Sequence, residues 1–343
     1  MQAARLTARK NIELTDIPVP EPAHDEVLVA VKSVGICASD VHYFNHGGIG
    51  NQYCVYPHAL GHECSGEVVQ ASRDSAFRKG DRVAVEPGRY CMRCEHCRGG
   101  RYNRCPNVRF LGGPNEAGAF QEYLSLHERQ LVKIPDSMSF DEAALLEPMG
   151  VGYHAVVLSA LKPGASVAVI GAGAVGLCTL ALAKACGAGE MFLFDRVRER
   201  LVFAEKQYTP DHCINTLSTD PIAYIHDHTG GRMVDAVFEA VGSQQTFTWA
   251  FEAAGIGGKV ILIGIPPNEI VGFDPHLVRR RELLVQNVRR SNRALHPCIR
   301  FVERKTVRIE PLATHHFPLS EISDAMHLAQ TYEDGAVRVM IRC

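Results

Sequence analysis

The stretch from Val167 to Asp195 constrains the fold more than any other part of the chain. It contains an apolar run at 167–170, the turn Gly171-Ala-Gly173-Ala-Val-Gly176, a run of small apolar residues, and a second apolar run that ends at Asp195. A strand, a G-x-G-x-x-G turn and a helix in this order, with an acid nineteen residues past the last glycine, are typical of a dinucleotide-binding βαβ unit. An ordinary glycine-rich loop is the competing interpretation, since the chain has 30 glycines. The flanking strand and helix favour the dinucleotide site.

Each glycine of this turn has a separate physical role. Gly171 permits the tight turn, Gly173 lets the backbone approach a pyrophosphate, and Gly176 lets the helix pack closely on the strand. The helix that follows offers unpaired N–H groups and a partial positive charge to the phosphates.

The residues around Asp195 bear on the choice between NAD and NADP. A carboxylate at the end of the second strand accepts hydrogen bonds from the adenosine ribose and repels a 2′-phosphate. Arg196 and Arg200 argue the other way, because arginines there can bind that phosphate. We expect NAD, because the acid is kept. Further cofactor contacts are expected at Val175, Ile263, Gly264, Ile265 and Val288.

The sequence pattern predicts an α/β fold with a doubly wound parallel sheet and a second, mostly β domain. Strand patterns at 167–170, 191–194, 234–238 and 259–263 alternate with helical patterns at 174–187, 197–207 and 244–254. A last strand is expected at 282–288, helices at 295–304 and 320–332, and a strand at 336–341. From about 26 to 153 the chain has short β-like runs and almost no long helical pattern. This change of character near 155 predicts two domains.

Composition excludes several classes of partner. A chain of 343 residues suits two domains, and its formal net charge of −2 gives no reason to expect nucleic acid or an anionic membrane. The first residues lack the apolar core of a signal peptide, and no run approaches the length of a membrane span. We therefore expect a cytoplasmic protein, in which the 12 cysteines serve as thiols or metal ligands.

Four cysteines lie within fifteen residues in the pattern C-x2-C-x2-C-x7-C. Such a set suits a closed tetrahedral zinc site with no open coordination position. The residues between them are polar and basic, so a hydrophobic core does not explain the cysteines. A redox-active pair lacks the surrounding thioredoxin-like pattern, and an iron–sulfur cluster remains an alternative. We expect a structural zinc bound by Cys91, Cys94, Cys97 and Cys105.

A second set of metal-ligating residue types is spread over three segments. These are Gly-Ile-Cys37-Ala-Ser39-Asp40, Gly-His62-Glu63 and Leu-Glu147-Pro. Taken singly, the cysteine can be a small buried apolar residue, the histidine a core residue, and Glu147 a helix-starting acid. Their joint presence with a dinucleotide turn and a four-cysteine segment shifts the balance toward a metal site.

Together these motifs resemble the zinc-dependent medium-chain alcohol and polyol dehydrogenases, and most closely the sorbitol dehydrogenase branch. The resemblance covers essentially the whole chain. It rests on GICASDVHYF at 35–44, GHECSGEVV at 61–69, GDRVAVEPG at 80–88, the four-cysteine segment, LLEPMGVGYHA at 145–155, the glycine turn and THHFPLSEISDAM at 314–326. Glutamate at 147 points to the polyol branch, because classical alcohol dehydrogenases have cysteine there.

The resemblance implies roles for the dispersed set. Cys37 and His62 would bind a catalytic zinc, and Glu63 and Glu147 would be the nearby carboxylates, either of which binds directly or through water. Asp40 would hold the second nitrogen of His62. The remaining catalytic roles are the acceptance of the alcohol proton and its passage toward solvent, by Ser39 and His42 respectively.

The family also implies a domain order, a reaction and an assembly. A GroES-like catalytic domain would comprise 1–155 and 290–343, with the Rossmann domain at 156–289. The expected reaction is the reversible, NAD-linked oxidation of a secondary hydroxyl of a polyol to a ketone, in a homodimer or homotetramer. A zinc-free quinone reductase relative and a non-catalytic, crystallin-type descendant are the rival interpretations. They are disfavoured because every ligand type is present.

The sequence departs from the sorbitol branch where an arginine followed by tyrosine contacts the polyol. Here Arg289 is followed by Arg290. A basic solvated face is one explanation, and a second charge aimed at the far end of the substrate is the other. The latter leaves open a sugar acid or sugar phosphate, since arginine binds either group bidentately. Tyr43 and Phe110 match substrate-pocket positions and are equally consistent with packing.

Overall fold

The computed structural model describes residues 1–114 and 116–343, which form two compact units. The first unit comprises Met1–Glu147, Leu295–Glu303 and Ile309–Cys343, and the second comprises Pro148–Ala294 and Arg304–Arg308. The division at 155 and 290 that the sequence suggests stays a proposal about functional domains. Among the described residues, no helix has the length and apolar character needed to cross a bilayer.

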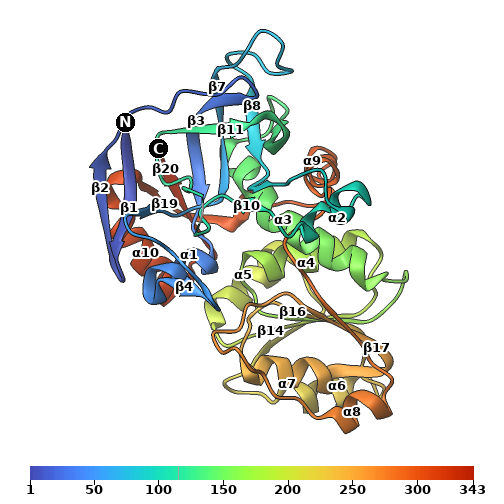
Figure 1. The fold of residues 1–343 in the computed structure, drawn as a ribbon. Helices are drawn as coiled ribbons and strands as arrows, with labels where there is room; N and C mark the ends of the chain where they lie inside the picture. Colours follow the sequence, from blue (N-terminus) through green and yellow to red (C-terminus); the bar gives the residue numbers. More distant parts are fainter. Residues whose placement is uncertain (115) are drawn as a thin grey trace. The chain divides into compact units, whose positions relative to one another are not determined.

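The first unit is built on a seven-stranded sheet in which the last strand of the chain pairs with an early strand. Strand β20, at the red end of the colour scale in Figure 1, lies between the blue strand β3 and the late strand β19. The order along the main path is β12 (Leu131–Lys133), β8 (Arg82–Val85), β7 (Glu63–Gln70), β3 (Glu26–Gly35), β20 (Arg338–Arg342) and β19 (Ala313–Pro318). Strand β11 (Tyr123–His127) also pairs with β3.

Smaller elements complete this unit. Strands β2 (Asn11–Asp16), β1 (Gln2–Ala8) and β6 (His58–Ala59) form a three-stranded sheet. Two-residue strands pair as β4 (Gly48–Ile49) with β5 (Gln52–Tyr53) and β9 (Gly88–Arg89) with β10 (Arg109–Phe110). Its helices are α1 (Ala38–His46), α2 (Glu95–Arg98), α9 (Leu295–Glu303) and α10 (Ile322–Thr331). Alternating valines and leucines of β3 and its neighbours, packed with Phe120 and Met326, form the core.

The second unit is a six-stranded sheet in which every pair of strands is parallel. Its order is β15 (His212–Asn215), β14 (Met191–Asp195), β13 (Val167–Ile170), β16 (Val234–Glu239), β17 (Ala254–Leu262) and β18 (Leu284–Asn287). The helices are α4 (Ala174–Ala185), α5 (Arg198–Tyr208), α6 (Pro221–His228), α7 (Gln244–Ala253) and α8 (Pro275–Arg280). The strand order reverses at β13, so a crevice is expected at the carboxyl ends of β13 and its neighbours.

The structure corrects the elements expected from the sequence in places. The segment before 153 was expected to have almost no long helix, yet α3 runs from Phe140 to Ser159, with Pro148 inside it. Proline removes one backbone donor and usually ends a helix, which explains why the pattern pointed to a helix start near Glu147. The segment 143–150 is buried throughout, so packing outweighs the local penalty of the proline. Strand β15 and helix α6, absent from the expected pattern, are also present.

Candidate functional site

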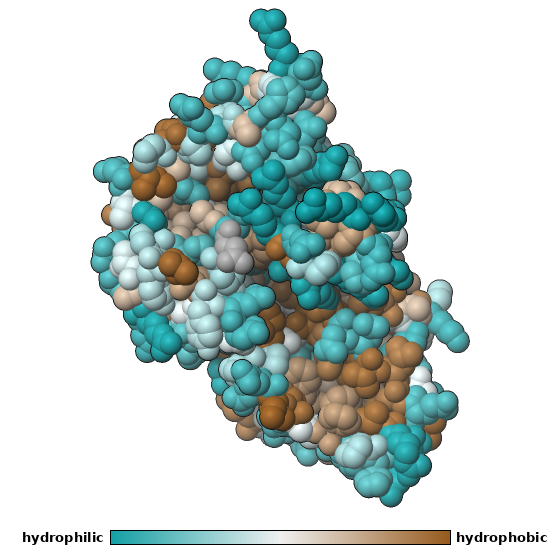
Figure 2. All heavy atoms as spheres, viewed as in Figure 1, coloured by the Kyte–Doolittle hydropathy of each residue, from teal (hydrophilic) through white to brown (hydrophobic). Residues whose placement is uncertain are grey.

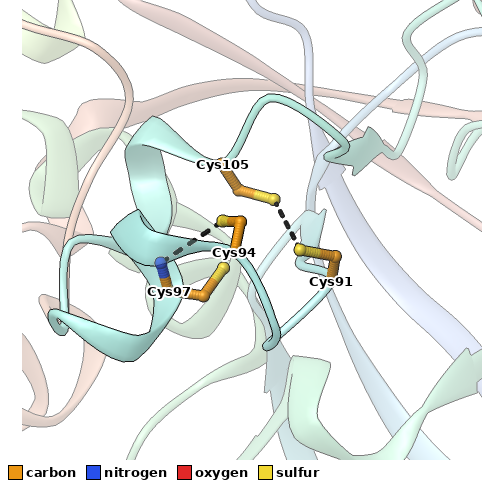
Figure 3. A group of neighbouring side chains, drawn as sticks. All are labelled: Cys91, Cys94, Cys97 and Cys105. Carbon is orange, nitrogen blue, oxygen red and sulfur yellow. Dashed lines mark hydrogen bonds between the residues drawn. The ribbon is translucent and has the colours of Figure 1, made fainter.

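The four cysteines of the 91–105 segment converge. Each offers a sulfur, and these atoms all lie within 4.8 Å of one another. Figure 3 shows the four side chains turned toward a common centre, with the Sγ atoms of Cys91 and Cys105 3.5 Å apart. Four sulfurs around a zinc ion lie about 3.8 Å from one another at Zn–S bonds of about 2.3 Å. The arrangement therefore fits a closed zinc site.

Backbone groups and burial shift the pKa values of two thiols of this segment in opposite directions. The backbone N–H groups of Arg93 and Cys94 lower the pKa of Cys91 to about 6. Burial and the neighbouring thiols raise the pKa of Cys97 to about 12. All twelve cysteines are free thiols and lie within the described residues. Four thiols without disulfides are the form that binds a metal, since the ligand is the thiolate.

Three of the dispersed residues also converge, in the first unit. One ligand atom each from Cys37, His62 and Glu63 lies within 4.8 Å of the others. Cys37 is the N-cap of α1, and His62 and Glu63 stand at the start of β7. His62 and Glu63 are buried, with 6% and 0% of their surface exposed. One thiol, one imidazole and one carboxylate in an otherwise buried position suit a zinc site with an open place.

Asp40 organises this donor cluster. Its Oδ2 accepts a hydrogen bond from the backbone N–H of Cys37 at 2.9 Å, and its Oδ1 accepts one from Gly61 at 3.0 Å. The Nδ1 of His62 is 3.6 Å from Oδ1, which places the expected outer partner beside the ring. Burial opposes protonation of His62, but Asp40 and Cys37 outweigh it and hold the pKa of His62 well above its usual value. The negative charge that raises this pKa would also favour a metal cation, which competes with the proton for the ring nitrogen.

Glu147 lies near the cluster but outside the three converging residues. It is buried, with 8% of its surface exposed, and burial raises its pKa to about 8. Glu63 and Glu86 add to this rise, and His62 and Arg338 work against it. Of the two carboxylates, Glu63 and not Glu147 has its ligand atom within 4.8 Å of those of Cys37 and His62. Glu147 is the carboxylate with a raised pKa beside them.

The sequence interpretation missed Arg338. Its Nη2 lies 3.1 Å from Oε1 of Glu63, and its Nη1 donates to the backbone oxygen of Ile36 at 2.6 Å. Arg338 lies on the last strand, so no spacing within the motif could have identified it. The one signal in the sequence was an arginine inside the apolar 336–341 run, and the structure shows that it is buried.

The other predicted catalytic and substrate residues lie on two elements. Ser39 and His42 stand three residues apart on α1, directly after Cys37, so they share one helix face. Burial lowers the pKa of His42, and the charge of His46 adds to this. The ring of Phe110 lies 5.3 Å from that of His62. Tyr43 is buried in the core of the unit, which favours its packing role.

The glycine turn in the second unit has the expected form. Gly171 follows β13 with φ at +106°, a conformation that other residues rarely adopt. A Cβ on Gly176 would collide with the carbonyl oxygen of Gly171, so the helix can approach only with glycine there. A Cβ on Gly173 would meet only Nη1 of Arg200, at 3.8 Å. The turn therefore leaves room, beside a cation, for a phosphate, which fits a dinucleotide.

Asp195 and Arg200 flank this turn. The Oδ2 of Asp195 accepts from the backbone N–H of Ala172 at 2.6 Å, and Oδ1 accepts from Val197 at 2.8 Å. Arg196 is exposed, whereas Arg200 is 9% exposed. The carboxylate thus supports the turn itself in addition to any contact with a ribose.

Further expected cofactor residues lie where β17 and β18 end. Ile263, Gly264 and Ile265 follow β17, and Val288 follows β18. Glu239, which the sequence interpretation missed, holds this region: its backbone oxygen accepts from Ile263 at 2.8 Å and from Gly264 at 3.0 Å. Val175 lies in the first turn of α4.

The expected anion-binding arginines lie just past β18. Arg289 is exposed and Arg290 is partly buried. The backbone of Arg290 has φ at +55°, in the left-handed region. Non-glycine residues adopt this conformation rarely, and such positions gather at ligand sites.

Comparisons with known proteins agree with these features. The family described as the alcohol dehydrogenase GroES-like domain matches residues 23–136, and the family described as zinc-binding dehydrogenase matches residues 174–304. Sorbitol dehydrogenase of Bacillus subtilis is 38% identical over 342 residues, covering 99% of this chain and 97% of that protein. The chain belongs to the zinc-dependent medium-chain dehydrogenases, in the sorbitol dehydrogenase branch. It is an oxidoreductase.

Solved structures show the same fold. An Escherichia coli oxidoreductase named ECK1772, described as of unknown specificity, superposes with a TM-score of 0.93 at 32% identity, covering 99% of this chain and 98% of that one. A zinc-binding dehydrogenase from Sinorhizobium meliloti, described as bound to NADP, superposes with a TM-score of 0.92 at 29% identity, covering 100% and 99%. The GroES-like plus Rossmann architecture predicted from the sequence is therefore confirmed.

Proposed function

We propose that this dehydrogenase oxidises a secondary hydroxyl of a sorbitol- or xylitol-like polyol to a ketone, reversibly, with NAD as the hydride acceptor. The observation that carries the proposal is the buried cluster of Cys37, His62 and Glu63, whose ligand atoms lie within 4.8 Å of one another. The 38% identity to a sorbitol dehydrogenase supports the polyol class. Two zinc ions per chain are proposed, one in this cluster and one among the four cysteines.

The residues of the cluster divide the chemistry between them. A zinc ion bound there supplies a Lewis acid that makes a substrate hydroxyl more acidic. Ser39 accepts the hydroxyl proton, and His42, one helical turn further on, passes it toward solvent. The lowered pKa of His42 favours its neutral ring, which can take up a proton and release it readily. Glu147 accepts a hydrogen bond from a neighbouring hydroxyl, which favours polyols over simple alcohols.

The choice of NAD rests on Asp195. Its carboxylate stands at the glycine turn, where it would repel the 2′-phosphate of NADP. The NADP-bound relative and the exposed Arg196 represent the opposing case.

A sugar acid or sugar phosphate is the second candidate substrate class. Two consecutive arginines, Arg289 and Arg290, favour it, because a guanidinium binds a carboxylate or a phosphate through paired hydrogen bonds. The left-handed backbone at Arg290 adds to this case.

Assembly and location belong to the same proposal. We propose a cytoplasmic homodimer or homotetramer with a small-molecule substrate and neither nucleic acid nor membrane as a partner. The outer edge of β18 supports self-association, since Leu284 and Val285 are 52% and 40% exposed. Figure 2 shows brown, hydrophobic side chains at the surface where Figure 1 draws β17.

The deciding experiment is a comparison of substrates and metals. We expect kcat/KM to be highest for sorbitol or xylitol with NAD, and lower for ethanol, a sugar acid and a sugar phosphate. If ethanol is the best substrate, the polyol assignment is wrong. If the sugar acid or sugar phosphate is best, and Arg290→Tyr but not Arg279→Tyr reverses that order, the anionic class replaces it. Metal analysis should find two zinc ions per chain, whereas the quinone-reductase-like and crystallin-type interpretations require one or none.

A further inference from the structure

Three neighbouring strands bring a buried arginine to the donor cluster. In β20 Met340 pairs with Gly35 of β3, and Gly35 pairs with Glu63 of β7. Arg338 stands two residues before Met340, so the side chains of Arg338 and Met340 project from the same face of the sheet. From there the guanidinium of Arg338 reaches across β3 to Glu63. The last strand of the chain therefore supplies a cation to a cluster that early segments build.

Both ends of this contact are closed to solvent. Arg338 is 7% exposed and Glu63 is 0% exposed. Nη2 of Arg338 lies 3.1 Å from Oε1 of Glu63, while Nη1 donates to the carbonyl of Ile36, which precedes Cys37 in the chain. One guanidinium thus holds both the carboxylate and the backbone that leads into the thiol ligand.

Gly35 provides the room for this contact. It lies within β3, and a Cβ at this position would collide with Oε2 of Glu63 and come within 3.4 Å of Cδ of Arg338. Strand geometry suits residues with side chains better than glycine, so local conformation gives no reason for glycine here. The reason is the space beside β3, which the side chains of Glu63 and Arg338 fill.

We propose that Arg338 is a positioning residue for the Cys37, His62 and Glu63 centre. Its charge lies beside Glu63 and restrains that carboxylate, which offers an oxygen to a metal ion, and Gly35 keeps open the space that the carboxylate occupies. This inference rests on the proposed function, because it assumes that the cluster binds a metal.

The charges of the buried groups support this role. A zinc ion with the thiolate of Cys37 and the buried carboxylates of Glu63 and Asp40 would carry one net negative charge, which the guanidinium of Arg338 balances. Unpaired buried charges are strongly unfavourable, so the arginine lets both carboxylates stay ionised around the metal.

A purely structural explanation is that the ion pair only joins β20 to β7. Loss of the pair would then lower stability and leave metal binding unchanged. The two explanations differ in readouts that report on the metal and not on the fold.

The test uses the full chain with zinc retained in the four-cysteine site and cobalt(II) placed in the open site, checked by total metal analysis. The variants are Arg338→Met, Arg338→Lys and Gly35→Ala. Arg342→Met serves as the matched control, because Arg342 lies on the same strand and pairs with Asp141 instead. The readouts are the cobalt d–d spectrum and the cobalt dissociation constant from competition with a chelator.

We expect Arg338→Met and Gly35→Ala to weaken cobalt binding by about 10- to 100-fold, the usual effect of losing an outer partner of a metal ligand. Their d–d bands should also weaken, because a freed carboxylate can bind through both oxygens and raise the coordination number. Arg338→Lys should be intermediate, and Arg342→Met should match the wild type.

Two results would overturn the inference in different ways. Wild-type cobalt affinity and spectra in Arg338→Lys and Gly35→Ala would show that the pair has a structural role alone, even if Arg338→Met fails to fold. Absence of a second metal in the wild type would instead overturn the proposed function, and this inference with it.

Discussion

At the scale of single residues, Glu147 is held beside the Cys37, His62 and Glu63 cluster by a helix that runs through Pro148. Burial raises its pKa to about 8, so its environment is unlike that of a surface acid. We expect Glu147→Gln, which keeps the volume and removes the ionisable carboxyl, to lower kcat/KM at least 100-fold, about 2.7 kcal/mol of transition-state stabilisation. Circular dichroism and the content of two zinc ions should be unchanged. Full activity in Glu147→Gln, or an equal loss in the same-helix control Glu142→Gln, would contradict this role.

Asp195 makes a second prediction at this scale. Removing its charge should relieve the repulsion of a 2′-phosphate and leave Arg196 and Arg200 to attract it. We expect Asp195→Ala to raise the ratio of kcat/KM for NADP to that for NAD by about tenfold, or ~1.4 kcal/mol. Because Ala172 and Val197 lose their acceptor, thermal stability should fall as well. Comparable wild-type efficiency with both cofactors would show that the arginines already compensate.

Residue identities were predictable where a local motif carries them and not where the fold brings distant residues together. Cys37 and His62 stand in short motifs whose residue types suggest ligation, and the structure places them together. Which of Glu63 and Glu147 comes nearer depends on how β7 and α3 pack, and no spacing reports that. Arg338 reaches Glu63 from a strand hundreds of residues later in the chain, so only the assembled sheet reveals it.

At the scale of elements, the four-cysteine segment has little regular structure of its own. It contains the four-residue helix α2, a single 3-10 turn and no strand between Cys91 and Cys105. We therefore expect a bound metal to be the main source of its order. We expect Cys94→Ser to reduce zinc from two ions per chain to one and to lower the thermal midpoint by roughly 5–10 °C, since each kcal/mol corresponds to about 2–4 °C in a domain of this size. A loss of stability in Glu147→Ala equal to that in Cys94→Ser would refute the division between structural and catalytic sites.

Strand β6 carries a buried histidine whose titration should be visible in stability. Burial lowers the pKa of His58 below its ordinary value of 6.5, and the backbone of Gly112 and Gly113 offsets part of this. The fold therefore favours the neutral ring, and the associated stability is present above about pH 6.5 and lost as the pH falls through the lower, folded-state pKa. We expect the unfolding free energy of the wild type to fall more steeply than that of His58→Gln between about pH 7 and pH 5. Parallel curves from denaturant titrations would argue against it.

Elements of the second unit were easier to predict than those of the first. Its buried parallel strands are continuous apolar runs, and the expected 167–170 strand matches β13. Strand β15 and helix α6 were missed because polar residues, including His212 and His226, interrupt their apolar pattern. In the first unit, β4, β5 and β6 are two-residue strands set by tertiary contacts, which leave no periodicity to detect.

At the scale of the whole molecule, the fold and family follow from motifs spread along the full sequence. The glycine turn, the two cysteine-containing motifs and the Glu147 segment are far apart, so their joint occurrence is a stronger constraint than any one of them. Assembly is a different matter, because it depends on which surface the folded chain leaves apolar. Exposure of Ile256 at 87% and of Leu284 at 52% is a property of the finished sheet.

The outer edge of β18 gives the assembly a specific test. This strand pairs with β17 on one side only, and its edge has neither proline nor lysine to discourage pairing with another chain. Two copies related by a two-fold axis can pair such edges antiparallel and bury Leu284 and Val285. Light scattering after gel filtration should therefore give the wild type two or four times the chain mass of 37.7 kDa. Val285→Lys should shift it toward smaller species.

The matched control for this prediction is Leu217→Lys. Leu217 is 78% exposed and follows β15, the strand at the opposite edge of the same sheet. If any exposed aliphatic residue at or near a sheet edge sufficed for association, both substitutions would change the mass alike. We expect only Val285→Lys to do so, with an unchanged circular dichroism spectrum. A lysine on β18 would place a charge in the proposed interface between two copies, whereas a lysine beyond β15 would stay in solvent. A monomeric wild type, or dissociation by Leu217→Lys alone, would move the interface away from β18.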